Sequence, residues 1–80
     1  MCLGVPMQIM TIDGFLARCG AKGVERDVSL FLLQDETVVP GDFVMVHVGY
    51  AIQKMTPQEA SSTWEVLDEM LKLELEEQHA

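Results

Sequence analysis

Residues 43–59, FVMVHVGYAIQKMTPQE, decide the fold, because they join the most strand-like part of the chain to its clearest helix start. Residues 43–48 are rich in β-branched and apolar side chains, which is typical of a strand. Gly49 interrupts this run, and residues 50–55 continue as a further strand. We therefore expect a β-rich part that ends near residue 55 and a helical part that follows it.

The helix start carries a complete capping signal. Thr56 is a good N-cap, Pro57 suits the first helical position, and Glu59 stands where it can bond back to the cap amide. Two apolar stripes then recur at helical spacing, Ala60, Trp64, Leu67 and Leu71 in the first and Val66, Met70 and Leu73 in the second. The first stripe should pack on the strands, whereas the second either packs there too or stays partly open for a partner. We predict a helix over 56–75 and a frayed tail over 76–80.

Upstream of residue 43, short strands alternate with turns. The expected strands are 7–12, 15–19 and 24–28, separated by Asp13-Gly14 and by the glycine-rich turn 20–23. The run 30–33 is apolar enough to be buried, and a polar loop follows it. Short strands with such turns, closed by one helix, predict a mainly β fold, a small OB-fold-like barrel over 1–55 with one C-terminal α-helix. At 80 residues, 1–80 should form a single domain.

Charge and composition exclude several classes of protein. The net charge is −8, and the five Lys and Arg residues are scattered, which argues against a nucleic-acid partner. Residues 57–80 alone hold seven acids and one base. This acidity indicates a solvated helix, or a face that steers toward a basic partner. No apolar run is long enough for a bilayer and no secretory leader is visible, so we expect a cytoplasmic protein without membrane contact.

The sequence lacks the motifs of an enzyme. It contains neither GxGxxG nor a P-loop, so no nucleotide site is predicted. Its serines stand outside any nucleophile-elbow motif. Two cysteines and two histidines without zinc-ligand spacing do not predict a zinc site. We therefore expect a protein that is not a catalyst.

Two residues remain as candidates for chemistry, and each has two interpretations. If Met1 is removed, the Cys2 thiol sits beside a charged α-amino group that favours the thiolate, a soft metal ligand. Otherwise Cys2 is a free cysteine at a loosely ordered end. His47 breaks an apolar strand and suits metal ligation or proton transfer, or it simply occupies the polar side of the strand. Cys19 has no such context and is expected to act as a small buried hydrophobe.

Three segments resemble the signature blocks of the HypC/HupF/HybG hydrogenase maturation factors. They are Met1-Cys2-Leu3-Gly4-Val5-Pro6, Gly23-Val24-Glu25-Arg26-Asp27-Val28 and Val46-His47-Val48-Gly49-Tyr50-Ala51, in the order and at spacings compatible with the family. The resemblance implies an OB-like barrel with a C-terminal helix. It also implies a small chaperone that binds a HypD-type iron–sulfur scaffold protein and the [NiFe]-hydrogenase large-subunit precursor.

The same resemblance implies site residues and a cargo. The cargo is an Fe(CN)2CO fragment, bound transiently, with no nucleotide and no zinc. Cys2 would take part in both partner contacts and hold the iron, and His47 would be a second ligand or proton partner. The implied partner-binding residues are Cys2, Leu3, Gly4, Val5, Pro6, His47, Gly49 and Tyr50. The alternative is a metal-free adaptor that only bridges the same two proteins.

Overall fold

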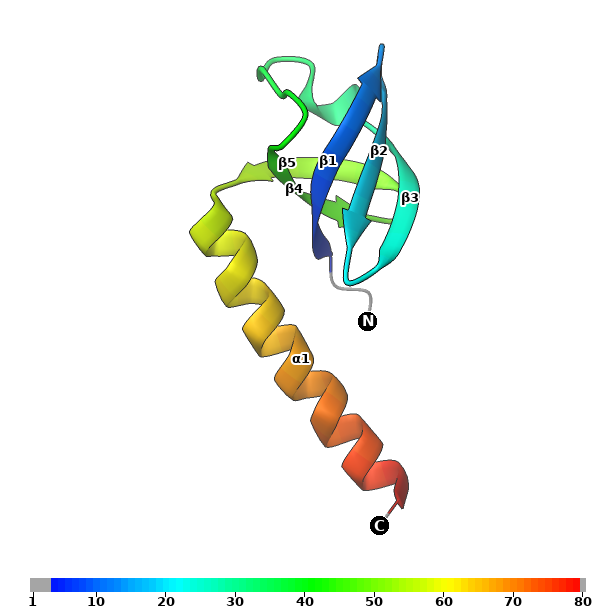
Figure 1. The fold of residues 1–80 in the computed structure, drawn as a ribbon, viewed down its shortest axis with the longest axis vertical. Coiled ribbons are helices and arrows are strands. Elements are labelled where there is room, and N and C mark those ends of the chain that lie inside the picture. Colours follow the sequence, from blue (N-terminus) through cyan, green and yellow to red (C-terminus); the bar gives the residue numbers. More distant parts are fainter. Residues whose placement is uncertain (1–3, 80) are drawn as a thin grey trace.

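A closed five-stranded barrel and one long helix make up the protein (Figure 1). The computed structural model describes residues 4–79, and the side chains of residues 4–71. The strands are β1 (Val5–Asp13), β2 (Leu16–Ala21), β3 (Val24–Ser29), β4 (Phe43–His47) and β5 (Tyr50–Met55). A 3₁₀ turn, η1 (Phe31–Leu33), follows β3, and the helix α1 (Pro57–His79) ends the chain.

The strand order around the barrel is β1-β2-β3-β5-β4, and β4 pairs with β1 to close it. All neighbours are antiparallel except β3 and β5, which meet in parallel through Ser29 and Tyr50. This arrangement confirms the predicted mainly β, OB-fold-like barrel with one C-terminal helix. The seam between β3 and β5 is short, because a single residue pair, Ser29 and Tyr50, joins these two six-residue strands.

The core fills the barrel with alternating side chains, as the two-residue period of a strand requires. Its fully buried members include Ile9, Val28 and Val44. Cys19 is also fully buried, which confirms its prediction as a small hydrophobe. Burial raises the pKa of the Cys19 thiol, because the thiolate loses its hydration inside the barrel.

The apolar run 30–33 was predicted to be buried, which is confirmed for Leu30 and Leu33 and wrong for Phe31 and Leu32. Leu30 and Leu33 are 4% and 5% exposed, whereas Phe31 and Leu32 are 57% and 59% exposed. The reason is the 3₁₀ turn, in which side chains three residues apart lie on the same side. Phe31 is not isolated, since its ring packs edge-on against Phe15 with 5.8 Å between the ring centroids.

The helix begins as predicted and ends later. The Thr56 amide donates to Glu59 Oε1 at 2.8 Å and the Glu59 amide donates to Thr56 Oγ1 at 3.1 Å, which confirms the capping box. At the other end α1 continues to His79, past the predicted end at 75, and includes most of the segment expected to fray. Glu and Gln favour helix even without an apolar pattern, which accounts for the longer element.

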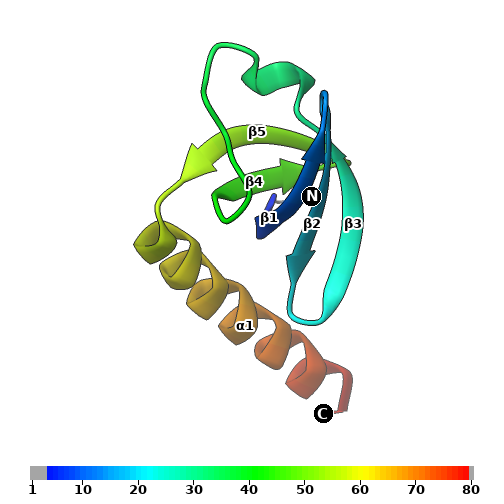
Figure 2. The ribbon, with the colours of Figure 1, turned by 45° about the horizontal axis from the view of Figure 1, so that its top comes forward.

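Among the side chains that the structure describes, those in the first half of α1 pack on the barrel. Ala60 is 2% exposed, and the indole Nε1 of Trp64 donates to the Pro6 carbonyl at 2.9 Å. Lys22 lies in the turn between β2 and β3. Its Nζ atom is 5.3 Å from the Trp64 ring centroid and forms an ion pair with Asp68 Oδ2 at 3.1 Å. Figure 2 shows α1 passing this turn before it projects away.

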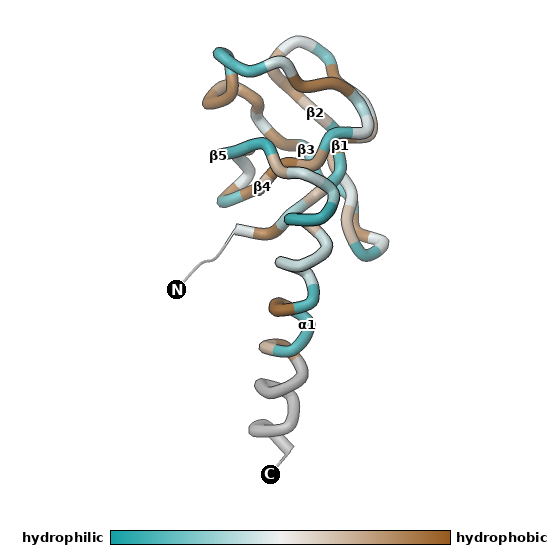
Figure 3. The backbone as a smooth tube through the Cα atoms, turned by 90° about the vertical axis from the view of Figure 1, so that its left-hand side faces the viewer, coloured by the Kyte–Doolittle hydropathy of each residue, from teal (hydrophilic) through white to brown (hydrophobic). Residues whose placement is uncertain are grey.

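The second half of α1 extends beyond the barrel and makes the molecule elongated, 47 × 22 × 22 Å. Leu71 of the first stripe is 54% exposed, and Val66 and Met70 of the second are 59% and 43% exposed. Figure 3 shows hydrophobic positions among hydrophilic ones along the coloured part of α1. Within the described residues no helix is long and apolar enough to cross a membrane.

Candidate functional site

The start of β1 lies beside the end of β4, and this juxtaposition defines the candidate site. Val5 pairs with Val46 and Pro6 pairs with Met45, in antiparallel register. The same register, continued by one residue, sets Gly4 opposite His47. Of the predicted site residues, Cys2 and Leu3 lie outside the described residues. The described members Gly4, Val5 and His47 therefore gather at one place on the barrel.

Gly4 is held in close contact with its neighbour on β4. A Cβ atom at this position would lie 2.6 Å from Met45 Sδ, 2.8 Å from Met45 Cγ and 3.2 Å from the Val46 carbonyl oxygen. Contacts below 3.0 Å require something to shift, so glycine is the residue that lets the Met45 side chain lie across the chain here. Met45 was not among the site residues predicted from the sequence, because its contact with Gly4 joins residues that are far apart in the chain.

The helix holds β1 two residues further along. Pro6 is fully buried, and its carbonyl accepts the indole hydrogen bond from Trp64. A Trp indole N–H that is removed from water generally finds such a partner, and here the partner is 58 positions away in the sequence. The described start of β1 thus contacts both Met45 of β4 and Trp64 of α1.

His47 ends β4 at a tight turn. It is half-buried and pairs with Tyr50, which is 47% exposed. Val48 and Gly49 form the turn, and both have positive φ, +52° and +81°. Two positive φ values are the mark of the type I′ turn, whose twist matches that of the strands. The predicted strand extended through Val48, and the turn ends it one residue earlier.

Val48 is the unusual member of this turn. A β-branched residue at φ of +52° is an outlier, because its side chain crowds the backbone there. Its side chain is also 74% exposed, the largest exposed fraction among the large hydrophobic residues described. Strained and exposed residues of this kind cluster at functional sites. Gly49, which interrupts the strand-like run in the sequence, lies in this turn.

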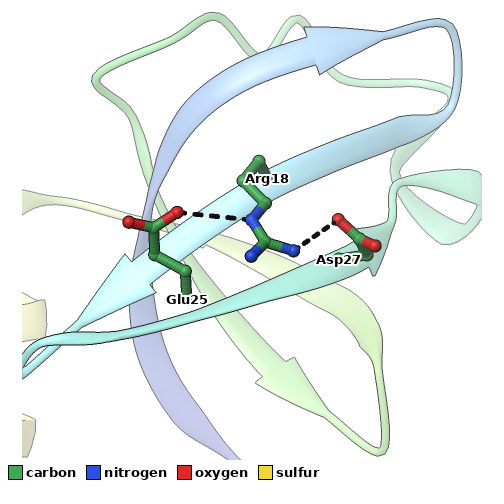
Figure 4. A network of polar contacts seen from close by, with 3 residues as sticks. All are labelled: Arg18, Glu25 and Asp27. Carbon is green, nitrogen blue, oxygen red and sulfur yellow. Dashed lines mark hydrogen bonds and ion pairs between the residues drawn. The ribbon is translucent and has the colours of Figure 1, made fainter.

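The segment 23–28, the second of the three blocks, has a structural part in the barrel. It forms the turn before β3 and most of that strand. Arg18 on β2 forms two ion pairs with residues of β3 (Figure 4). Its Nη1 lies 2.9 Å from Asp27 Oδ1, and its Nε lies 3.3 Å from Glu25 Oε1. The hydrogen bond to Asp27, and then the one to Glu25, raises the pKa of the Arg18 guanidinium. These exposed ion pairs join β2 to β3 on the outside of the barrel.

The described residues do not by themselves form a closed metal centre. Within the part of the chain that the structure describes, no three His, Cys, Asp or Glu side chains come together in a way that could hold an ion.

Comparison with known proteins finds relatives that share one family name. The model of the HupF/HypC family matches residues 1–67 of the chain. Hydrogenase maturation factor HypC of Escherichia coli strain K12 is 44% identical over 78 residues, covering 92% of this chain and 87% of its own length. HypC of Rhizobium leguminosarum bv. viciae is 39% identical over 70 residues, covering 86% and 91%. The hydrogenase expression/formation protein HupF of Bradyrhizobium diazoefficiens is 42% identical over 60 residues, covering 75% and 59%.

Proposed function

Because the chain belongs to the HupF/HypC family, we propose that it is a chaperone that carries an Fe(CN)2CO fragment to the precursor of a [NiFe]-hydrogenase large subunit. In this proposal it receives the fragment from a HypD-type iron–sulfur scaffold protein. Membership in the family makes the chain a hydrogenase maturation factor and not an enzyme. We also propose a cytoplasmic location, where free thiols stay reduced.

The observation that carries the proposal is the position of Gly4 beside the His47 end of β4. Cys2 is two residues from Gly4 in the sequence, and two residues of extended chain span at most about 7 Å. This distance along the chain allows the Cys2 thiol to reach the His47 end of β4, and we propose that it does so. A thiolate and an imidazole within reach of each other form a suitable ligand pair for iron.

The chemistry of a carrier favours few ligands. Cyanide and carbon monoxide already occupy three positions on the iron, so one or two protein ligands suffice to hold it. Cys2 supplies the soft thiolate, and His47 supplies either a nitrogen ligand or a proton acceptor near the bound fragment. Such an open site leaves the remaining positions for the ligands of the scaffold or of the hydrogenase subunit. Release of the iron fragment then requires the exchange of only one or two iron–protein bonds.

The same end of the barrel presents apolar surface to a partner. Val48 and Tyr50 are exposed on either side of Gly49, next to His47. Exposed aromatic and aliphatic residues beside a reactive group are typical of a recognition surface. We propose that this turn, together with residues 2–6, contacts both partners in succession.

The experiment is anaerobic purification of the chain in complex with its scaffold partner. Iron content and the infrared bands of bound cyanide and carbon monoxide are compared for the wild type, Cys2→Ala and His47→Ala. The remaining cysteine and histidine of the chain provide matched controls, Cys19→Ala and His79→Ala. We expect Cys2→Ala to lose the bands, His47→Ala to weaken or shift them, and both controls to keep them.

The outcome of this experiment separates the carrier from the metal-free adaptor. Unchanged bands in Cys2→Ala would rule out Cys2 as a ligand. If the wild-type complex forms with both partners but its iron is held entirely by the scaffold, the chain is an adaptor. The exposed Val48 and Tyr50 are the observation in favour of that second function.

A further inference from the structure

We propose that the outward edge of β3, residues 24–28, is a docking edge at which an extended segment of the scaffold partner adds a strand to the barrel. This inference rests on the proposed function for the identity of the partner, and it deepens that function by naming how the partner is held. It also gives a role in binding to the segment 23–28, which contains none of the residues of the candidate site.

Over most of its length β3 is paired on one side only. All six of its residues pair with β2, whereas the single pair of Ser29 and Tyr50 joins it to β5. Because β5 begins at Tyr50 and runs parallel to β3, it leads away from residues 24–28. Residues 24–27 are exposed, and Figures 1 and 2 both show β3 at the margin of the barrel.

The backbone groups of β3 alternate between β2 and the free edge. The two-residue turn 22–23 has φ of +52° and +80°, and the residues that flank such a turn bond to each other. Bonded and non-bonded pairs then alternate along the antiparallel ladder. Glu25, Asp27 and Ser29 therefore direct their N–H and C=O groups away from β2. The bond of the Ser29 amide to the Gly49 carbonyl, at 2.9 Å, agrees with this direction.

Two residues are left with outward backbone groups on this edge. Among the described residues, no backbone group bonds to the outward N–H or C=O of Glu25 or Asp27. Such a row of unpaired groups is a template for an added strand, which is a common mode of peptide recognition. The edge continues from the bond between Ser29 and Gly49, so it adjoins the exposed turn of Val48 that we propose as a partner contact.

The charges on β3 disfavour a second copy of the chain as the added strand. Residues 24–28 read apolar, acidic, basic, acidic, apolar. Antiparallel pairing of two copies about Arg26 would set the two Arg26 side chains opposite each other and each Glu25 opposite an Asp27. Pairing about Glu25 or about Asp27 would set identical carboxylates opposite each other. Like charges directly opposite destabilise a strand pair, so the occupant comes from a different protein.

The same charges define the chemistry of the occupant. On one face Glu25 and Asp27 flank Arg18, and two carboxylates beside one guanidinium leave a negative surface (Figure 4). On the other face Arg26 is exposed and forms no ion pair with another described residue. A complementary strand therefore reads apolar, basic, acidic, basic, apolar, with its apolar ends opposite the two valines of β3.

Amide hydrogen exchange, resolved to single residues, tests the edge in the unaltered chain. In the free protein we expect the amides of Glu25 and Asp27 to exchange faster than those of Arg26 and Val28, which bond to β2. In complex with iron-free scaffold protein, exchange at Glu25 and Asp27 should slow at least about tenfold, the effect of one new hydrogen bond. The scaffold segment protected in the same complex should carry the complementary charge pattern. Unchanged exchange at Glu25 and Asp27 in the complex overturns the proposal.

Two substitutions at one position separate the backbone from the side chain. Asp27→Pro and Asp27→Ala both lose the ion pair with Arg18, but only proline removes the outward N–H. Proline is tolerated on a strand edge where that N–H bonds to nothing. We expect the Kd for the scaffold to be at least about tenfold higher for Asp27→Pro than for Asp27→Ala, and equal values overturn the proposal. Resistance of the buried Cys19 to alkylation shows that each barrel is intact, and exchange in the wild type decides alone if one is not.

The docking edge and the carrier function fail in different ways, because binding is measured without iron. If Glu25 and Asp27 stay unprotected in the complex while Cys2→Ala loses the infrared bands, the edge is wrong and the carrier stands. If both amides become protected while Cys2→Ala keeps the bands, the edge stands and Cys2 is not the iron ligand. A chain that forms no complex with the scaffold overturns both.

Discussion

Val48 adopts a backbone conformation that valine disfavours, with a φ of +52°. Its left-handed backbone would suit asparagine, which is favoured before glycine in a type I′ turn. We predict that Val48→Asn raises the free energy of unfolding by about 1 kcal/mol, because it relieves a β-branched residue at positive φ. The same change should weaken capture of the scaffold partner, since it removes an exposed apolar side chain.

Urea denaturation and a pull-down with the partner measure the two effects. Val39→Asn, at a side chain that is 50% exposed in the loop before β4, is the matched control and should change neither. A Val48→Asn variant that gains no stability contradicts the strain argument. A variant that is more stable and binds normally contradicts the recognition role of the turn.

Cys19 makes stability depend on pH in the alkaline range. Burial raises the thiol pKa above its ordinary value of 9.0, so the folded chain keeps this proton after the unfolded chain has lost it. Its contribution to stability is therefore complete below pH 9.0 and falls as the pH rises above that value. The slope of the unfolding free energy against pH approaches about 1.4 kcal/mol per pH unit in this range.

Urea denaturation of wild type and Cys19→Ala between neutral pH and about pH 10 isolates this effect. The difference in unfolding free energy between the two proteins should shrink as the pH rises, because other titrating groups are shared. A constant difference across the range would show that the thiol ionises equally in both states.

At the scale of the element, α1 depends on its cap. Thr56→Ala removes the hydroxyl that accepts from the Glu59 amide, and we predict a loss of about 1 kcal/mol. Ser61→Ala deletes a hydroxyl from an exposed helical position, where alanine is preferred, and should cost nothing. Circular dichroism during thermal unfolding compares the two, and equal stabilities would contradict a role for the capping box.

The attachment of α1 to the barrel depends on Trp64. Trp64→Phe keeps the ring but loses the donor to the Pro6 carbonyl, and the expected cost is about 1 kcal/mol. Because the described contacts between α1 and the barrel lie in the first half of the helix, the loss of stability should be confined to the helix and its contact with β1. Amide exchange is predicted to accelerate in residues 60–71 and near Pro6, with β2 and β3 still protected. Uniform acceleration would instead indicate that helix and barrel unfold as one unit.

The elements that the sequence predicts well are those governed by neighbours along the chain. The capping box of Thr56 and Glu59 and the turn at Gly14 are local signals, and the structure confirms both. The 3₁₀ turn at Phe31–Leu33 was missed, because a short apolar run does not distinguish a strand from a turn that buries every third residue. The left-handed backbone of Val48 was missed because valine disfavours it.

At the scale of the whole molecule, the candidate site was only partly predictable. His47 and the N-terminal block were identified from the sequence, but their proximity depends on the pairing of β1 with β4. Met45 and Trp64 read as ordinary apolar residues, since their contacts are with Gly4 and Pro6, far away along the chain. Such contacts follow from barrel closure, which no local pattern encodes.

The pairing of β1 with β4 also determines when the site can exist. The two strands are about forty residues apart in the chain, so during synthesis the first leaves the ribosome well before its neighbour has been made. Pairing at such separation forms slowly, because a long loop must close first. The beginning of the polypeptide thus acquires its surroundings only when the barrel is complete. An incompletely folded copy therefore lacks the pairing that brings Gly4 beside His47, and with it the candidate site.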